Sequence, residues 1–327
     1  MSTTTTIPEL HTGEVPVQTP QQTTQVRQPR NPLDSALLLS VAWKWPSLSK
    51  TVTVDAVDIK GETPNTDKRK VHISKDLFDC PELKRLFNHA GQVDEFLYRR
   101  CSPFPLKRAV YLLPKDFFHE VENFLTEHAA ERVPMIEAAV NVYDQAVENA
   151  KIFLGPLFHA SDYPSKEIFR ASFEFSWHYL QIGISDALKE IDSQIAAREA
   201  DKMQSIFEEA GEACEKLLRT AMSDLVSNLV EKLEPSPTDG RKKVIRDTAM
   251  VNIHEFLSTF QARNLTGDTQ LQDLVDQANQ LLNGVSPAQL RDNEGLRATV
   301  QAGFTEIKEK LNSLIVVQPI RQIRLSD

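Results

Sequence analysis

The fold class is decided by residues 185–233, SDALKEIDSQIAAREADKMQSIFEEAGEACEKLLRTAMSDLVSNLVEKL. Apolar residues in this stretch recur every three or four positions, which is the spacing of one buried face of an α-helix. Ser185 can cap the first turn, and at ~1.5 Å per residue the helix would be roughly 70 Å long. The predicted apolar stripe consists of Leu188, Ile191, Ile195, Met203, Ile206, Ala210, Leu217, Ala221, Leu225 and Leu229.

Residues 114–153 show the same period and predict a second long helix. Pro134 should kink or divide this helix, because proline lacks a backbone N–H and crowds the preceding turn. Two amphipathic helices of this length predict an antiparallel hairpin that resembles a coiled coil. The stripe of the second helix consists of Val121, Leu125, His128, Met135, Ala139, Val142, Ala146, Ala150 and Phe153.

Between the two helices residues 171–181 predict a strand, because the residues at the centre of this stretch alternate strictly. Phe173, Phe175, Trp177 and Tyr179 share one face of it. We expect this strand to return to a small mixed β-sheet built by residues 35–113, the head of the molecule. The first two strands of the head should form a hairpin. The expected elements of the head are strands at 37–45, 51–59, 71–73 and 109–113 and a helix at 81–100.

The remaining chain divides into a tail, a linker and a C-terminal helical region. Residues 1–34 are rich in Thr, Gln and Pro and predict a disordered tail. The sequence EPSPTDG at 234–240 is a linker. The expected C-terminal elements are helices near 243–261, 269–283, 287–292 and 294–314 and a terminal edge strand at 316–325. The whole is a helix-dominated α+β protein with a head at 35–113, a helical hairpin at 114–234 and C-terminal helices at 241–327.

Composition favours a folded cytoplasmic protein. Apolar residues make up 41% and charged residues 25% of the 327, which is ordinary globular usage. The longest apolar runs are far shorter than the roughly 20 residues of a membrane helix. Three widely spaced cysteines predict a reducing compartment. The net charge of −9 is uneven, with +4 on residues 35–113 and −12 on residues 114–327, a polarity that can orient a partner.

Common catalytic and nucleotide-binding motifs are absent from the sequence. Ser47 and Lys50 match the S-x-x-K pattern, but its companion elements are missing, so the match is attributed to chance. His119 and His128 are nine positions apart and would lie on different faces of a helix. We therefore predict no catalytic residue, no cofactor and no metal site.

The best candidate binding surface combines aromatic and basic residues of the head. Aromatic rings that stack on bases, interleaved with cations that neutralise phosphates, are typical of single-strand nucleic-acid binding. The favoured alternative is structural: the two tryptophans belong to the buried face of a strand, and two arginines complement the dipole at a helix end. The candidate residues are Trp43, Lys44, Trp45, Lys50, Arg99, Arg100, Lys107 and Arg108.

Five stretches together carry a family resemblance. They are DCPELKRL (79–86), FLYRRCSPFPLKRAVYLLP (96–114), DYPSKEIFRASFEFSWHYL (162–180), EFLSTFQARNLTGD (255–268) and RDNEGLRATVQAGFTEIKEKL (291–311). In this order they resemble the bacterial, plasmid and phage proteins of the domain of unknown function family 3150. The similarity would cover residues 36–325, and it transfers no active-site residue.

The resemblance implies a context rather than an activity. Genes of this family often neighbour MoxR-type AAA+ ATPases and von Willebrand A-domain proteins that resemble cobaltochelatase subunits. The leading hypothesis is therefore a non-catalytic interaction protein, an adaptor or substrate of such an ATPase and A-domain pair, because a long exposed helical hairpin offers contact area without chemistry. The alternative is nucleic-acid binding by the basic head. An enzyme with an unfamiliar site is a third hypothesis, and self-association of the hairpin is left open.

Overall fold

The computed structural model describes residues 34–52, 73–105, 107–235 and 247–316. Within these ranges helices dominate and the strands are few, so the predicted α+β, helix-dominated class is confirmed. The predicted tail and terminal edge strand lie almost wholly outside the described residues, as does most of the linker.

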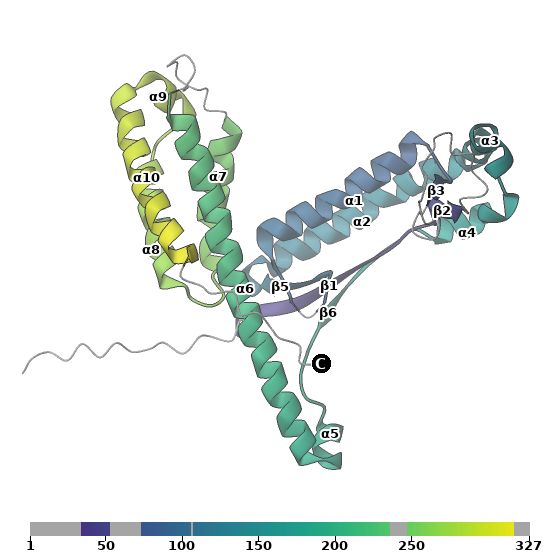
Figure 1. The fold of residues 1–327 in the computed structure, drawn as a ribbon, viewed down its shortest axis with the longest axis horizontal. Coiled ribbons are helices and arrows are strands. Elements are labelled where there is room, and N and C mark those ends of the chain that lie inside the picture. Colours follow the sequence, from purple (N-terminus) through teal and green to yellow (C-terminus); the bar gives the residue numbers. More distant parts are fainter. Residues whose placement is uncertain (1–33, 53–72, 106, 236–246, 317–327) are drawn as a thin grey trace, which may run out of the picture.

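A four-stranded sheet forms the centre of the molecule (Figure 1). Its order is β4-β5-β1-β6, and every pairing is antiparallel, so the expected mixed sheet was wrong. Leu38 of β1 lies between Leu112 of β5 and Leu180 of β6. The aromatic strand therefore joins the head sheet as expected. The strands are β1 (Ala36–Lys44), β4 (Ser102–Pro103), β5 (Val110–Pro114) and β6 (Glu174–Leu180).

The second predicted strand does not pair with the first. Strand β2 (Ser49–Val52) pairs with β3 (Ile73–Asp76) in a separate two-stranded sheet. The expected hairpin between the first two strands of the head was therefore wrong. Pro46, which lacks the donor that a ladder needs, separates β1 from β2. Residues 53–59 of the expected strand lie outside the described residues.

Helices cover both faces of the central sheet, because successive strand residues point to opposite sides. Leu39 and Leu113 face a core built with α1 (Pro81–Arg100) and α2 (Phe118–Asn141). Leu38 and Leu112 face the middle of α6 (Ser193–Leu233) through Ala210 and Cys214. Pro81 occupies the first turn of α1 as predicted.

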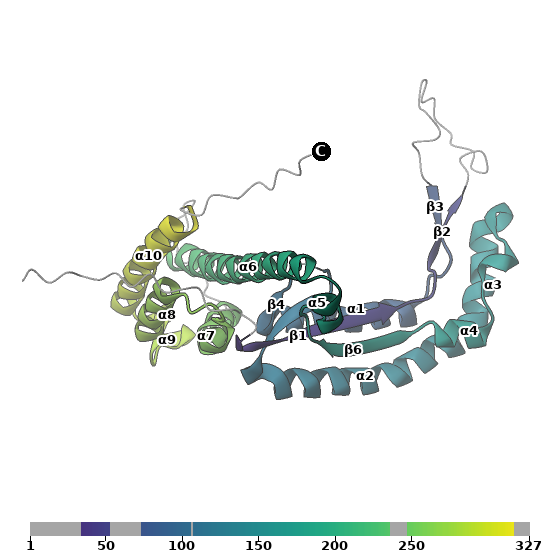
Figure 2. The same cartoon turned by 90° about the horizontal axis from the view of Figure 1, so that it is seen from below.

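The two long helices are each divided, but at unexpected places. Helix α2 continues through Pro134, curves along the sheet in Figure 2, and stops at Asn141 before α3 (Tyr143–Leu154). The second stretch forms α5 (Asp186–Ile191) and α6, separated by Asp192. The Asp192 carboxylate accepts hydrogen bonds from Gln194 N and Ile195 N, so it caps α6 where continuous helix was expected.

The predicted pairing of the two long helices was wrong. Helix α6 packs along α10 (Glu294–Val316) and α7 (Asp247–Arg263), whereas α2 packs antiparallel to α1 (Figure 1). The burial pattern of α6 explains this packing. Leu218 and Met222 are fully buried, whereas Leu217 and Ala221, their neighbours on the predicted stripe, are half-buried. The true core face is shifted by one residue toward the C-terminal helices.

The C-terminal helices fall where the sequence predicted them. Besides α7 and α10 they are α8 (Thr269–Leu282) and α9 (Pro287–Asp292). Ser286 forms the expected capping box with Gln289. With the second half of α6 these helices enclose one apolar core that includes Phe260 and Phe304. We call this part the C-terminal bundle.

Charged side chains fix α6 within the C-terminal bundle. The Arg219 guanidinium donates to the Asp268 carboxylate at 2.7 Å, and both side chains are buried. Asp268 also accepts from Leu271 N and so caps α8. Arg297 donates to the carbonyls of Leu233 and Lys232 at the end of α6.

A smaller core closes the far end of the molecule. Phe78, Tyr143 and Phe169 pack there beside α3 and α4 (Lys166–Ala171). Three 3₁₀ turns complete the described structure: η4 (Lys115–Phe117), η5 (Gly155–Leu157) and η6 (Ala160–Asp162). In the described part of the chain, no helix combines the length and the apolar character that crossing a bilayer requires.

Candidate functional site

The two tryptophans of the predicted binding surface use their ring faces within the protein. Trp43 and Trp45 stack with centroids 5.8 Å apart, and the Arg132 guanidinium carbon lies 4.8 Å and 4.9 Å from their centroids. Trp43 also stacks on Phe175 at 4.2 Å. We call these four residues the tryptophan cage. Its rings are engaged by protein groups, which agrees with the structural interpretation rather than with base stacking.

The two arginines of the predicted surface connect the head to the C-terminal bundle. Arg99 and Arg100 end α1 and donate to the Glu255 carboxylate on α7 at 2.9 Å and 2.8 Å. Arg100 also donates to Glu120 at 2.8 Å, and Arg99 to Glu95 at 2.6 Å. These cations are neutralised by carboxylates, so they do not form a free basic patch.

The other four residues of the predicted surface lie apart from these. Lys50 pairs with Asp162, which also pairs with Lys75 at 2.6 Å, near the two-stranded sheet. Lys44 ends β1, while Lys107 and Arg108 precede β5. These three side chains are exposed, and no ion pair joins them to another described residue. The structure therefore does not gather the eight residues into one surface.

The Glu255 tether gives a testable prediction. Glu255→Gln should lower the free energy of unfolding by roughly 1–2 kcal/mol at pH 7, because two partly exposed charge-assisted bonds weaken. Hydrogen bonds from Arg100 and the charge of Arg99 hold the pKa of Glu255 below its ordinary 4.5. The stabilisation is therefore complete above pH 4.5 and is lost as pH falls below that value.

Urea denaturation at pH 7 and at pH 3 measures this difference. The matched control is Glu95→Gln, whose carboxylate pairs with Arg99 inside α1 alone. It should change stability by less than about 0.5 kcal/mol. A Glu255→Gln variant as stable as wild type at pH 7 would show that the tether contributes nothing.

Two histidines meet on the facing sides of α1 and α2. His89 and His128 stack with ring centroids 3.7 Å apart and an interplanar angle of 12°. Glu131 follows His128 by one helical turn on α2. Its carboxylate lies 3.0 Å from His89 Nε2. One ligand atom from each residue can be chosen so that all three lie within 4.8 Å of one another. We call His89, His128 and Glu131 the histidine cluster.

The histidine cluster borders the tryptophan cage. The His128 ring meets the rings of Trp43 and Phe175 edge-on, at 6.3 Å and 5.7 Å. Its Nε2 atom is buried and has no hydrogen-bond partner within the described part of the chain. Burial, followed by the charges of His89 and Arg132, lowers the pKa of His128 from 6.5 to about 4. The imidazole of His128 is thus neutral at pH 7.

Sequence reasoning missed the histidine cluster. It compared His128 with His119 on the same helix, whereas the structural partner is His89, on a helix that packs antiparallel to it. The spacing H-x-x-E of His128 and Glu131, which places both on one face of a helix, was an available signal.

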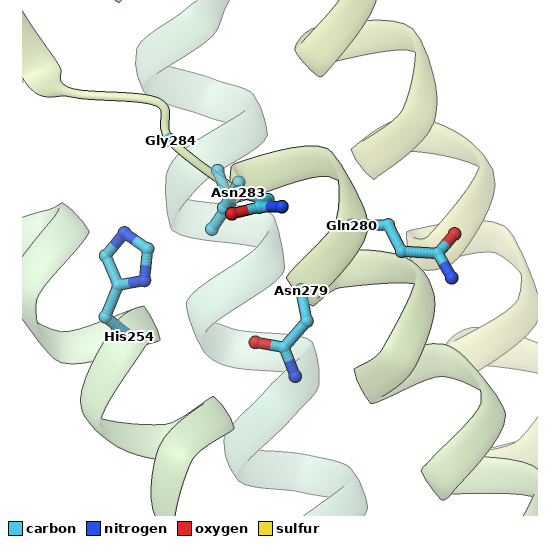
Figure 3. A pocket seen from close by; sticks show the side chains of 6 residues that line it. His254, Asn279, Gln280, Asn283 and Gly284 are labelled. Carbon is cyan, nitrogen blue, oxygen red and sulfur yellow. The ribbon is translucent and has the colours of Figure 1, made fainter.

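Two open surface depressions lie in the C-terminal bundle. One of about 410 Å³ lies between α7 and the end of α8 (Figure 3). Its polar lining comes from His254, Asn279, Gln280 and Asn283, and Gly284 beyond α8 adopts a left-handed φ of 70°. A neighbouring hollow of about 690 Å³ shares His254 and Asn279. His254 is the only ionisable side chain lining the first, so it offers no acid–base pair for catalysis.

The thiols of the described residues do not supply a nucleophile either. Cys80, Cys101 and Cys214 are free and buried. Burial raises the pKa of Cys101 to about 12 and raises the pKa of Cys80 and Cys214. A thiol in such surroundings stays protonated at neutral pH and is unreactive.

The start of α6 projects from the molecule together with α5 (Figure 1). Along residues 193–205, Ala196 is the one fully buried residue. Two large apolar side chains are exposed there: 81% of the surface of Ile191 and 38% of that of Ile195. We call residues 186–205 the projecting corner. It places part of the predicted apolar stripe in solvent.

Comparison of the chain with models of protein families, with curated proteins and with solved structures gives no match. The resemblance to family 3150 therefore stays a prediction.

Proposed function

We propose that this chain is a non-catalytic adaptor that binds a protein partner through the projecting corner. The observation that carries the proposal is the exposure of Ile191 at the end of α5 and of Ile195 in the first turn of α6, where the chain projects from the molecule. Large apolar side chains on a helix are anchors for a partner's groove. Scattered exposed apolar residues need no explanation, but these two flank Asp192 at the junction of α5 and α6, where the chain projects and Ala196 is the one buried residue along 193–205.

Two further observations support an adaptor over an enzyme. The carboxylates of Glu255 and Asp268 form ion pairs between helices, and the depression at the end of α8 has a single ionisable lining residue, His254. The 41-residue helix α6 connects the projecting corner to the central sheet and to the C-terminal bundle. A partner bound at the projecting corner would therefore be attached to α6, which contributes to the core beneath the sheet and to the core of the C-terminal bundle.

The family resemblance suggests which partner to test. A MoxR-type AAA+ ATPase and a von Willebrand A-domain protein are the proposed partners, because genes of the resembling family neighbour them. We expect the tagged full-length chain, co-expressed with a MoxR-type ATPase and a von Willebrand A-domain protein from the same genome, to co-purify with at least one of them. Recovery of neither from the co-expressing cells would contradict the partner assignment.

A substitution at the corner tests the surface separately. Ile191→Asp combined with Ile195→Asp should weaken partner binding about tenfold or more, because loss of a buried apolar anchor costs over 1 kcal/mol. Val251→Asp is the matched control, since Val251 is 61% exposed on α7, away from the corner. Equal affinities of wild type and the corner variant, measured by biolayer interferometry, would place the interface elsewhere.

A further inference from the structure

The side chains that meet between α1 and α2 have the composition of a metal site. His89 supplies one imidazole from α1, and α2 supplies the imidazole of His128 and the carboxylate of Glu131. Two imidazoles and one carboxylate are a donor set that proteins use for Zn²⁺ and related first-row divalent ions, with one position left for water. We propose that the histidine cluster binds a divalent transition-metal ion of the Zn²⁺ type.

The distances within the cluster fit such an ion. With metal–ligand bonds of about 2.0–2.1 Å, two ligands of a tetrahedral Zn²⁺ lie about 3.3 Å apart. His89 Nε2 and Glu131 Oε2 are 3.0 Å apart, and the three ligand atoms lie within 4.8 Å of one another. The three side chains are therefore close enough to share one ion after side-chain adjustment.

An unsatisfied buried atom points independently to a ligand. His128 is 3% exposed, and its Nε2 has no hydrogen-bond partner among the described residues. A buried polar atom without a partner costs free energy that a bound ion recovers.

Access and charge also favour the site. The Glu131 side chain is 69% exposed, so the cluster opens to solvent on that side and an ion can enter. Arg132, which follows Glu131 in the sequence, is a buried cation, but its guanidinium lies against the faces of Trp43 and Trp45, which partly offset its charge. The Glu131 carboxylate is the anionic ligand that balances the incoming ion.

Metal binding should change the arrangement of the two rings. A metal lies in the plane of each imidazole that binds it, and the nearly parallel planes of His89 and His128 cannot both contain one ion. One ring must therefore rotate out of the stack on binding. The bound ion would link α1 to α2 directly across the face that covers the central sheet.

Titration of the purified full-length chain with Zn²⁺, and with Co²⁺ as a spectroscopic probe, tests the proposal. We expect one ion per chain, a rise in Tm, and the visible absorption bands of Co²⁺ bound by nitrogen and oxygen in a four- or five-coordinate site. Loss of the His89–His128 stack should shift the imidazole resonances of both residues in NMR spectra.

Variants separate this site from adventitious binding. Glu131→Gln, which changes an exposed side chain and should leave the fold intact, and His89→Gln should each weaken Zn²⁺ binding at least about a hundredfold, more than the 10–100-fold effect of an outer-shell group. His119→Gln removes an exposed histidine of α2 outside the cluster and should leave affinity unchanged. Absence of binding to wild type, or equal affinity of the wild-type and Glu131→Gln proteins, would overturn the proposal.

Discussion

Replacing Asp268 with alanine should lower the free energy of unfolding by about 3–5 kcal/mol, because it leaves the Arg219 guanidinium buried without its carboxylate. Arg219 and Asp268 are 8% and 7% exposed, and their atoms are 2.7 Å apart. The same substitution removes the carboxylate that caps α8 through Leu271 N. Urea denaturation followed by circular dichroism at pH 7 measures the loss.

A second substitution shows whether the orphaned charge is the cause. The double variant Asp268→Ala with Arg219→Met should be more stable than Asp268→Ala alone, since no unpaired guanidinium remains buried. Asp276→Ala, on the exposed side of α8, is the matched control and should cost less than about 0.5 kcal/mol. A loss below about 1 kcal/mol for Asp268→Ala would mean that water satisfies Arg219.

Trp43→Ala should cost about 3 kcal/mol or more, a loss typical of truncating a packed aromatic residue. Trp43 contacts Trp45, Phe175 and the Arg132 guanidinium, so its removal opens a void and uncovers a buried cation. If Trp43 were instead a platform for nucleic-acid bases, its removal would weaken binding and leave stability nearly unchanged.

Two controls distinguish these outcomes for Trp43. Trp43→Phe keeps an aromatic face toward Arg132 and should lose clearly less stability than Trp43→Ala. Lys44→Ala changes the neighbouring exposed cation and should leave stability within about 0.5 kcal/mol of wild type. Thermal and urea unfolding of the three variants, with single-stranded DNA binding measured in parallel at low salt, separates the two roles.

Local patterns predicted individual elements well. Strict alternation over 173–179 corresponds to β6, Pro81 begins α1, and the capping residues from Ser286 begin α9. Each of these signals depends on residues within one turn or one strand, where the backbone conformation is set by immediate neighbours. Such signals survive whatever the element later packs against.

Partner choice between elements could not be predicted in the same way. Helix α6 carries apolar residues on more than one face, with Leu217 half-buried beside the fully buried Leu218. Periodicity gives the direction of an apolar face but not the identity of the helix that covers it. The same limit hid the histidine cluster, because His89 and Glu131 are 42 positions apart and meet only through helix packing.

The continuity of α6 determines how the chain can be dissected. Ala210 and Cys214 complete the core beneath the sheet, while Leu218 through Leu233 complete the core of the C-terminal bundle. A fragment ending at residue 234, the boundary suggested by the linker composition, would expose the apolar face of the second half of α6 to solvent. Such a fragment should precipitate or associate with itself. The part of the chain before residue 234 and the C-terminal bundle should therefore be expressed together as one folding unit.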